Sequence, residues 1–319
     1  MPECTAHPPR GCGSRRARGE GGVPFGVPIV HVDSLAHADQ RLSVYANMRD
    51  AELAQRHDPL DPRAHAGVFI AEGELVLRRL IQSRFAVQSV LTTPARAPAL
   101  ADMLAALDPA VPVFLAPPAV LDQIVGFNMH RGVLGVGVRG PGLTFDDLLA
   151  LPGPMLVLED LVNHDNLGGV FRNAAALGGP GVSILLSPRC ADPLYRKSLR
   201  VSMGLALGVP YARATQWPGT LDDLKSRGTQ VWALTPNPGS VDLGDLTRGP
   251  PLRVALVLGS EGSGLSEPAF QAADKLVRIR MHPADPAVDS LNVAMAGGIA
   301  LALLGQAGWI GEGRESASG

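Results

Sequence analysis

Lysine is almost absent from this sequence. Only three of its 28 basic residues are lysines (Lys197, Lys225 and Lys275), so arginine carries nearly all of the positive charge. The net charge of −2 excludes a global electrostatic attraction to nucleic acids or membranes. A polyanionic partner would have to bind a local patch, and arginine suits such a patch because its guanidinium binds phosphate in a fork and stacks on bases. Aromatic residues are also few, at 4%, so Ala, Val and Leu must fill the core of the 319-residue chain.

Cysteine is scarce as well. Cys4, Cys12 and Cys190 form no C-x-x-C pair, which argues against a disulfide framework or a zinc site and fits a reducing, cytoplasmic location. No apolar run is long enough to span a bilayer, and the most apolar stretch, residues 291–305, is predicted to be a buried helix. We therefore expect a globular protein with neither a membrane partner nor a bound metal.

The pattern of the chain divides it into two α/β units. Residues 1–23 contain arginine but no apolar core, so they are predicted to be a disordered leader and not a secretory signal. Residues 24–140 form the first unit, residues 141–153 a linker rich in Pro and Gly, residues 154–311 the second unit, and residues 312–319 a frayed tail. In the first unit, a helix at 44–57 precedes strands at 67–73, 85–93, 111–118 and 132–140, which alternate with helices at 74–84, 96–108 and 119–127.

The second unit has unbroken apolar strands. They are predicted at 155–160, 181–187, 209–215, 230–236, 253–259 and 275–281, and a helix at 290–309 closes the unit. Unbroken apolar character is typical of parallel strands that are covered on both faces. Strands that alternate with helices predict a doubly wound, largely parallel sheet, which binds its ligands beyond the carboxyl ends of the strands.

Polar residues follow three of these strands. The first group, in DLVNHDNLGGVFRNAAALG (160–178), contains Asn166, a candidate N-cap, and Arg172, which lies one and a half turns into the next helix. The second is the turn that contains Gly259 and Glu261. It lacks the Lys-Ser/Thr pair of a phosphate loop, and a glutamate inside it favours a cationic or donor-rich ligand over a phosphate.

The third group opens the closing helix. Ser290 is a candidate N-cap there, and the buried surroundings expected for Asn292 require a hydrogen-bond partner for its side chain. Taken singly, each group also fits ordinary helix capping or an ordinary glycine turn.

In their order along the chain, the patterns N-x-G-x-x-x-R, G-x-E-x-x-G-L and S-L-N-V strongly resemble the three motifs of the SpoU/TrmH branch of the SPOUT RNA methyltransferases. This resemblance covers residue 155 to the closing helix. The first unit, with FIAEGELVLRRL and HRGVLGVG, resembles the small RNA-binding domain, related to a ribosomal-protein fold, that precedes many of these enzymes.

The resemblance implies a fold, a cofactor and a set of site residues. It implies that the second unit ends in a trefoil knot and binds S-adenosylmethionine, with contacts from Thr235, Leu258, Gly259, Ile279, Met281 and Leu291. It further implies catalytic roles for Asn166, Arg172, Glu261, Ser290 and Asn292, with Asn166 and Glu261 holding the Arg172 side chain. The loop at 282–289 departs from the family pattern, since it lacks a glycine and a Pro-Met pair.

The implied reaction is transfer of a methyl group to a ribose 2′-hydroxyl of a structured tRNA or rRNA, catalysed by a homodimer that associates through the knotted unit. Arg172 is either the base or an electrostatic stabiliser, and a guanidinium is a poor base. Candidate RNA contacts are Arg79, Arg84, Arg131 and Arg196. Two alternatives stay open: a non-catalytic RNA-binding relative, and a nucleotide-phosphate-binding enzyme that uses the Gly259 loop.

Overall fold

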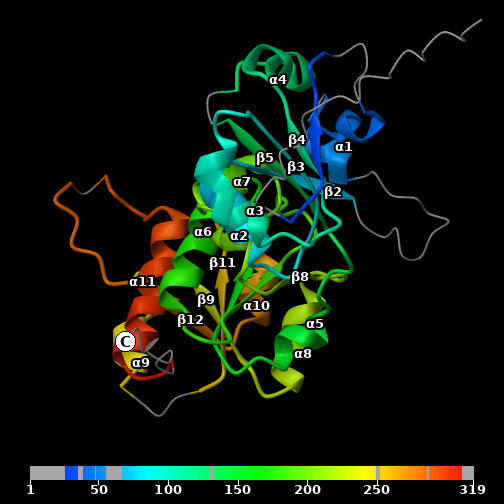
Figure 1. The fold of residues 1–319 in the computed structure, drawn as a ribbon. Helices are drawn as coiled ribbons and strands as arrows, with labels where there is room; N and C mark the ends of the chain where they lie inside the picture. Colours follow the sequence, from blue (N-terminus) through cyan, green and yellow to red (C-terminus); the bar gives the residue numbers. More distant parts are fainter. Residues whose placement is uncertain are drawn as a thin grey trace, which may run out of the picture.

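A computed structural model describes residues 26–34, 39–46, 48–54, 67–129, 132–248, 252–285 and 287–310. The predicted leader and tail, Cys4, Cys12 and Arg131 lie outside these residues. Within them the chain forms two sheets, each with its own helices (Figure 1). The α/β class predicted from the sequence is therefore confirmed.

The first sheet has the strand order β1-β4-β3-β5-β2. Its strands are β1 (Ile29–His31), β2 (Val68–Glu72), β3 (Ala86–Thr92), β4 (Val113–Leu115) and β5 (Val133–Val138). Strands β1, β4 and β3 are parallel, whereas β5 is antiparallel to both β3 and β2. Strand β1 was not predicted, because three residues are too few to show a periodic pattern.

Helices of the first unit are shorter than the sequence indicated. They are α1 (Asp50–Ala54), α2 (Glu74–Ile81), α3 (Ala101–Ala105) and α4 (Pro118–Val125), with 3-10 turns at Gln40–Val44 and Ala97–Leu100. Of the helix predicted at 44–57, Val44 ends a 3-10 turn, Tyr45 and Ala46 form a turn, and α1 begins only at Asp50. The helix predicted at 96–108 likewise divides into a 3-10 turn and α3.

The second sheet is parallel throughout, with the strand order β10-β12-β9-β11-β6-β7-β8. Its strands are β6 (Met155–Leu158), β7 (Ser183–Leu186), β8 (Tyr211–Arg213), β9 (Gln230–Leu234), β10 (Val241–Asp242), β11 (Val254–Leu258) and β12 (Lys275–Arg278). Strand β11 inserts between β6 and β9, which precede it in the chain. A doubly wound sheet binds ligands beside such a point of insertion, beyond the carboxyl ends of the strands.

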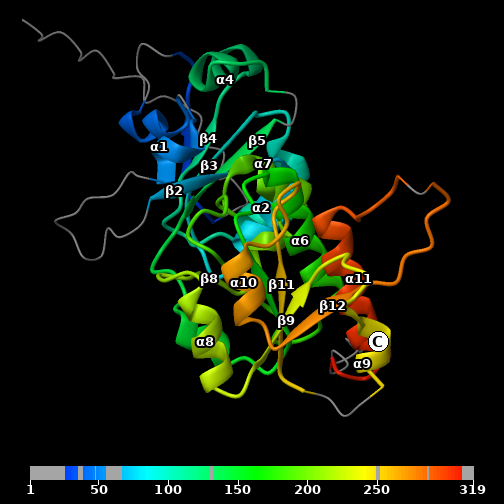
Figure 2. The same cartoon turned by 180° about the vertical axis from the view of Figure 1, so that it is seen from behind.

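Both faces of this sheet are buried, which explains the unbroken apolar runs. Leu156 and Leu158 of β6 face one core cluster, while Met155 and Val157 face another, because successive side chains of a strand point to opposite faces. Helices α6 (His164–Leu177) and α11 (Val293–Gln306) lie side by side near one face, as both views show. Helices α8 (Gly219–Ser226) and α10 (Glu267–Ala272) cover the other (Figure 2).

The segment predicted as a linker contains a helix. Helix α5 (Phe145–Leu149) begins with a capping box in which Thr144 and Asp147 exchange hydrogen bonds. Leu148 and Leu149 then pack in the core cluster of Met155 and Val157. The segment predicted as a linker therefore contains a helix that packs with the second unit.

Ion pairs and apolar contacts join the two units. Arg139 pairs with Asp192 at 2.6 Å, and Arg196 of α7 (Arg196–Val201) pairs with Asp50 at 3.4 Å. One core cluster contains Phe69 and Leu77 of the first unit together with residues of β6. No helix in the described ranges is long and apolar enough to cross a membrane.

Candidate functional site

A cavity of about 700 Å³ opens at the carboxyl ends of β9, β11 and β12. Every one of the six residues predicted to contact a cofactor lines it: Thr235, Leu258, Gly259, Ile279, Met281 and Leu291. Three of the predicted catalytic residues, Glu261, Ser290 and Asn292, line it as well. The turn after β11, the segment after β12 and the start of α11 thus meet around one space.

The turn after β11 depends on glycine for two reasons. Gly262 and Gly264 have φ values of 82° and 66°, in the left-handed region that side chains disfavour. A Cβ atom on Gly259 would lie 2.2 Å from the carbonyl carbon of Gly264, so the two sides of the turn could not approach. Ser260 and Gly264 close the turn with two backbone hydrogen bonds of 3.1 Å.

Asn292 joins the three motifs. Its Oδ1 accepts hydrogen bonds from the backbone N–H of Ala294 and of Met295, at 3.0 and 3.3 Å, so Asn292 is the N-cap of α11. Its Nδ2 then points away from the helix and donates to Oδ1 of Asn166 at 2.8 Å and to Oε1 of Glu261 at 3.2 Å. Asn292 is thereby partnered as the sequence required, although its side chain is exposed and not buried.

Two capping predictions were wrong. Helix α11 is capped by Asn292, while Ser290 is exposed and donates its hydroxyl to Asp289 at 2.8 Å. Helix α6 is capped by Asn163, which accepts from the N–H groups of residues 165 and 166. Asn166 lies inside the first turn of α6 and is only 7% exposed. In each helix the sequence offered several capping side chains within a few residues, and the tertiary contacts selected one.

Asn166 carries a buried donor with no partner. Its Oδ1 is occupied by Asn292, so the Nδ2 group points the other way, and within the described residues it has no hydrogen-bond acceptor. Buried polar groups are nearly always hydrogen-bonded, so this amide, which belongs to a residue that does not line the cavity, is a donor that the described residues leave unsatisfied.

Arg172 lies outside the cavity. It is exposed, it is not among the residues that line the space, and it has no hydrogen bond or ion pair within the described part of the chain. Gly168 of α6 packs against α7 and Gly169 packs against Ala294 of α11. Arg172 follows these glycines by about one turn and so lies on the outer surface between α7 and α11. The expectation that Asn166 and Glu261 hold Arg172 was wrong, because both bind Asn292 instead.

Three of the four predicted RNA contacts have neighbours within the chain. Arg196 donates to the carbonyl of Met48 at 2.7 Å in addition to its ion pair with Asp50, so it joins the two units and is not free for RNA. Arg84 stacks over the rings of Phe85 and Tyr211. Arg79 is exposed and packs its aliphatic stem close to Gly204. The fourth, Arg131, lies outside the described residues.

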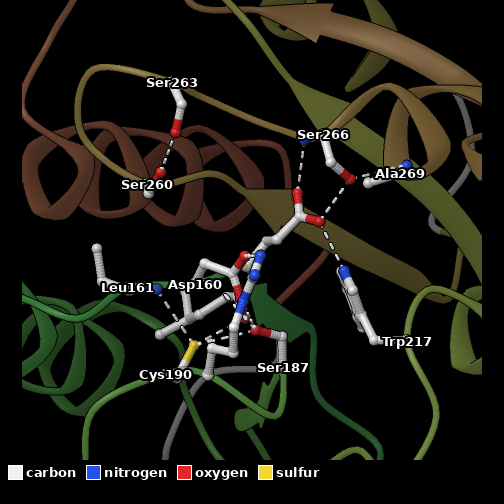
Figure 3. A network of polar contacts seen from close by, with 12 residues as sticks. Asp160, Leu161, Ser187, Cys190, Trp217, Ser260, Ser263, Ser266 and Ala269 are labelled. Atoms are coloured by element: carbon white, nitrogen blue, oxygen red, sulfur yellow. Dashed lines mark hydrogen bonds and ion pairs between the residues drawn. The ribbon is translucent and has the colours of Figure 1, made fainter.

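Sequence reasoning missed a buried carboxylate, Glu159. It follows β6, is 2% exposed, and accepts three hydrogen bonds: from Nε1 of Trp217, and from the backbone N–H and the hydroxyl of Ser266. Dashed lines from Trp217 and Ser266 in Figure 3 mark these hydrogen bonds. The available signal was a charged pair, Glu159 and Asp160, at the end of a buried strand.

Asp160, the residue after Glu159, does not line the cavity. Its φ of 54° is left-handed, it accepts a hydrogen bond of 2.9 Å from the Ser187 hydroxyl, and it forms an ion pair with Arg189. The hydrogen bond from Arg189 lowers the pKa of Asp160 below its ordinary value. Among the described residues there is no cluster of His, Cys, Asp and Glu that could hold a metal ion.

Fold and cavity together define an α/β protein with a ligand space at the carboxyl edge of a parallel sheet. Residues 153–302 match the model of the SpoU rRNA Methylase family. An uncharacterized tRNA/rRNA methyltransferase of Mycobacterium bovis is 40% identical over 255 residues, which cover 80% of this chain and 85% of the relative. The chain therefore belongs to the SpoU methylase family, as the three motifs predicted.

Solved structures show the same fold. The AdoMet-bound rRNA methyltransferase of Sinorhizobium meliloti superposes with a TM-score of 0.67 at 21% identity, over 87% of this chain and 98% of that one. The SpoU methyltransferase AviRb of Streptomyces viridochromogenes, in complex with AdoMet, gives a TM-score of 0.65 at 21% identity, over 83% and 97%.

Proposed function

We propose that this protein is a cytoplasmic, S-adenosylmethionine-dependent methyltransferase that acts on the ribose 2′-hydroxyl of a structured tRNA or rRNA. Membership of the SpoU family and the names of its relatives support the reaction class. The observation that carries the proposal for this chain is the hydrogen-bonded set of Asn166, Glu261 and Asn292, which brings the three motifs to one edge of the cavity.

The cavity fits the proposed cofactor in shape and in chemistry. Leu234, Leu258, Ile279 and Val293 are among its apolar lining residues and would enclose an adenine ring. Its volume of about 700 Å³ is that of a typical small-molecule site. Glu261 and Asp289 place carboxylates on the lining, which suits a ligand with a sulfonium and an ammonium group better than one with phosphates. This charge pattern disfavours a nucleotide-phosphate site.

The proposed cofactor supplies a methyl group that its sulfonium charge makes electrophilic. The protein would hold the methyl donor and the acceptor oxygen in line, and this positioning by itself lowers the barrier of the transfer. We assign Asn166 a positioning role, since its Oδ1 accepts from Asn292, which lines the cavity, while its own Nδ2 is buried. Arg172 would bind an RNA phosphate and stabilise negative charge on the reacting oxygen, because a guanidinium stays protonated and is a poor base.

Exposed apolar side chains beside the starts of α6 and α11 support a dimer. The N-terminal ends of α6 and α11 are adjacent, and beside them the apolar side chains of Val162, Leu291 and Met295 are 64%, 38% and 57% exposed. We propose that a second copy of the chain covers this surface, and that the second unit ends in a trefoil knot. Met295→Glu should then convert a dimer into a monomer in sedimentation velocity.

Nucleoside mass spectrometry of total RNA, from cells with and without the gene, tests the proposed reaction. We expect one 2′-O-methylated nucleoside to disappear when the gene is removed and to return with the wild-type gene, but not with an Arg172→Ala gene. Loss of a base-methylated nucleoside would contradict the ribose assignment. An unchanged profile would indicate a non-catalytic RNA-binding relative, and stabilisation by ATP but not by S-adenosylmethionine would indicate a phosphate site.

A further inference from the structure

The glycine turn that forms one wall of the cavity is held at both of its ends by one residue outside it, Glu159. All residues from 259 to 265 line the cavity. At the start of this segment, the backbone N–H of Glu159 donates to the carbonyl of Leu258 at 2.8 Å. At its end, the Glu159 carboxylate accepts from the N–H of Ser266 at 2.8 Å and from its hydroxyl at 2.6 Å.

The end of the turn is fixed in direction as well as in position. The Ser266 hydroxyl that donates to Glu159 also accepts from the N–H of Ala269 at 3.3 Å, which makes Ser266 the N-cap of α10. Helix α10 packs through Ala269 in the core of the second unit. The contact with Glu159 therefore connects the turn both to β6 and to a helix that is anchored in the core.

The chemistry of this contact requires a carboxylate. The three groups that face the side chain of Glu159 are the N–H of Ser266, the hydroxyl of Ser266 and the indole N–H of Trp217, at 2.6 Å, and all three donate (Figure 3). An ionised carboxylate only accepts and can satisfy all of them, whereas a glutamine amide would set an N–H group against another donor.

We propose that Glu159 is a positioning residue for the cofactor: its carboxylate sets the shape of the cavity wall by holding the end of the 259–265 turn at Ser266, while its backbone N–H, which any residue would supply, pairs with Leu258 at the start. The inference rests on the proposed function, in which this cavity binds S-adenosylmethionine. Glu159 does not line the cavity itself and acts through the turn. Glu261, which accepts from Asn292 at 3.2 Å, lies in the middle of the same turn, so its place beside Asn292 also depends on this contact.

The test compares Glu159→Leu, which keeps the size of the side chain but accepts nothing, with Glu159→Gln, which keeps one acceptor. Isothermal titration of the full-length proteins with S-adenosylmethionine should show a dissociation constant raised roughly tenfold or more for Glu159→Leu and by a smaller factor for Glu159→Gln. The KM for the cofactor should rise more than kcat falls, and RNA affinity should not change. Hydrogen exchange should accelerate in residues 259–265 and remain slow in β7.

Trp217→Phe is the matched control, because it removes a donor from the same carboxylate and leaves both ends of the turn held. It should bind the cofactor as the wild type does. If Glu159→Leu does not fold, the affinity for S-adenosylmethionine is compared in Glu159→Gln and Ser266→Ala instead. Wild-type affinity in the folded Glu159 variants, with only a lower melting temperature, would overturn the inference. Failure of the wild-type protein to bind S-adenosylmethionine would instead overturn the proposed function on which it rests.

Discussion

Asn292 and Asn166 are joined by a 2.8 Å hydrogen bond across 126 residues of sequence. The direction of this bond is set by α11, because the Oδ1 of Asn292 accepts from the first N–H groups of the helix and only its Nδ2 is left to donate. One side chain thus caps a helix and connects the start of α6 to the glycine turn.

Substitutions of Asn292 should separate its contribution to the stability of α11 from its contribution to methyl transfer. Asn292→Asp keeps an acceptor for the helix N–H groups, but its second oxygen would face the oxygens of Asn166 and Glu261, so it should keep the cap and lose stability through repulsion. Asn292→Ala should lose about 1 kcal/mol of unfolding free energy with the cap. Both should lose methyl transfer, by roughly 100-fold or more, because neither donates to Asn166 and Glu261. Urea denaturation and a tritium-transfer assay measure the two effects. An active Asn292→Asp variant would show that the donor is dispensable.

Arg172→Ala should abolish methyl transfer and leave the fold and the cofactor affinity unchanged. The side chain is exposed, lies outside the cavity and has no partner in the described part of the chain, so its removal costs no contact. Isothermal titration with S-adenosylmethionine, melting temperature and turnover are the measurements. Arg227→Ala is the control, since Arg227 is an exposed arginine that, within the described residues, pairs with Asp146 at the surface. Loss of cofactor binding in Arg172→Ala would place this residue in the cavity instead.

Gly168→Ala should be destabilising. A Cβ atom there would lie 2.7 Å from the carbonyl oxygen of Ser198 and 2.9 Å from Cβ of Val201, so α6 and α7 would have to separate. Overpacking of this kind costs about 1–3 kcal/mol of unfolding free energy.

Gly305 provides the matched control for Gly168, because it lies in α11 and a Cβ atom there meets nothing within 4 Å. Gly305→Ala should stabilise the protein by about 0.5–1 kcal/mol through helix propensity alone. Chemical denaturation of the two variants checks the pair, and a stable Gly168→Ala protein would show that α7 can shift without cost.

Removal of Arg196 should make stability depend on pH. Burial raises the pKa of Asp50 above its ordinary value, and Arg196 and, more weakly, His164 act to lower it. A carboxyl group with a raised pKa in the folded state destabilises the fold as pH rises from its unfolded pKa through the folded one. Without Arg196 the folded pKa rises further, so Arg196→Met should lose roughly 1–3 kcal/mol, with the larger loss at the higher pH.

Denaturation of Arg196→Met at pH 5 and pH 8 measures this dependence. The double variant with Asp50→Asn, which has no carboxyl group to titrate at this position, should lose the added pH dependence. A loss of equal size at both pH values would assign the effect to the hydrogen bond from Arg196 to Met48 alone.

The three motifs are recognisable in the sequence because residue type and spacing define them. Gly259, Glu261 and Gly264 follow a buried strand, and Asn292 opens an apolar helix, so the sequence placed them at strand ends and helix starts. The same local information could not say which of several polar residues caps a helix. Ser290 and Asn166 are good caps by propensity, but Asn292 and Asn163 occupy those positions.

By itself, the sequence determined the α/β class and the parallel second sheet, because apolar runs are local signals, and the family resemblance of its three motifs implied the residues around the cavity. Only the tertiary structure decided the partners of the polar groups. In the folded chain Asn292 donates hydrogen bonds to Asn166 and Glu261. Arg196 forms an ion pair with Asp50, and Arg172 is exposed. The tertiary structure also showed that Glu159 holds the glycine turn, since hydrogen bonds between residues about a hundred positions apart depend on how the strands are ordered, and no local pattern encodes that order.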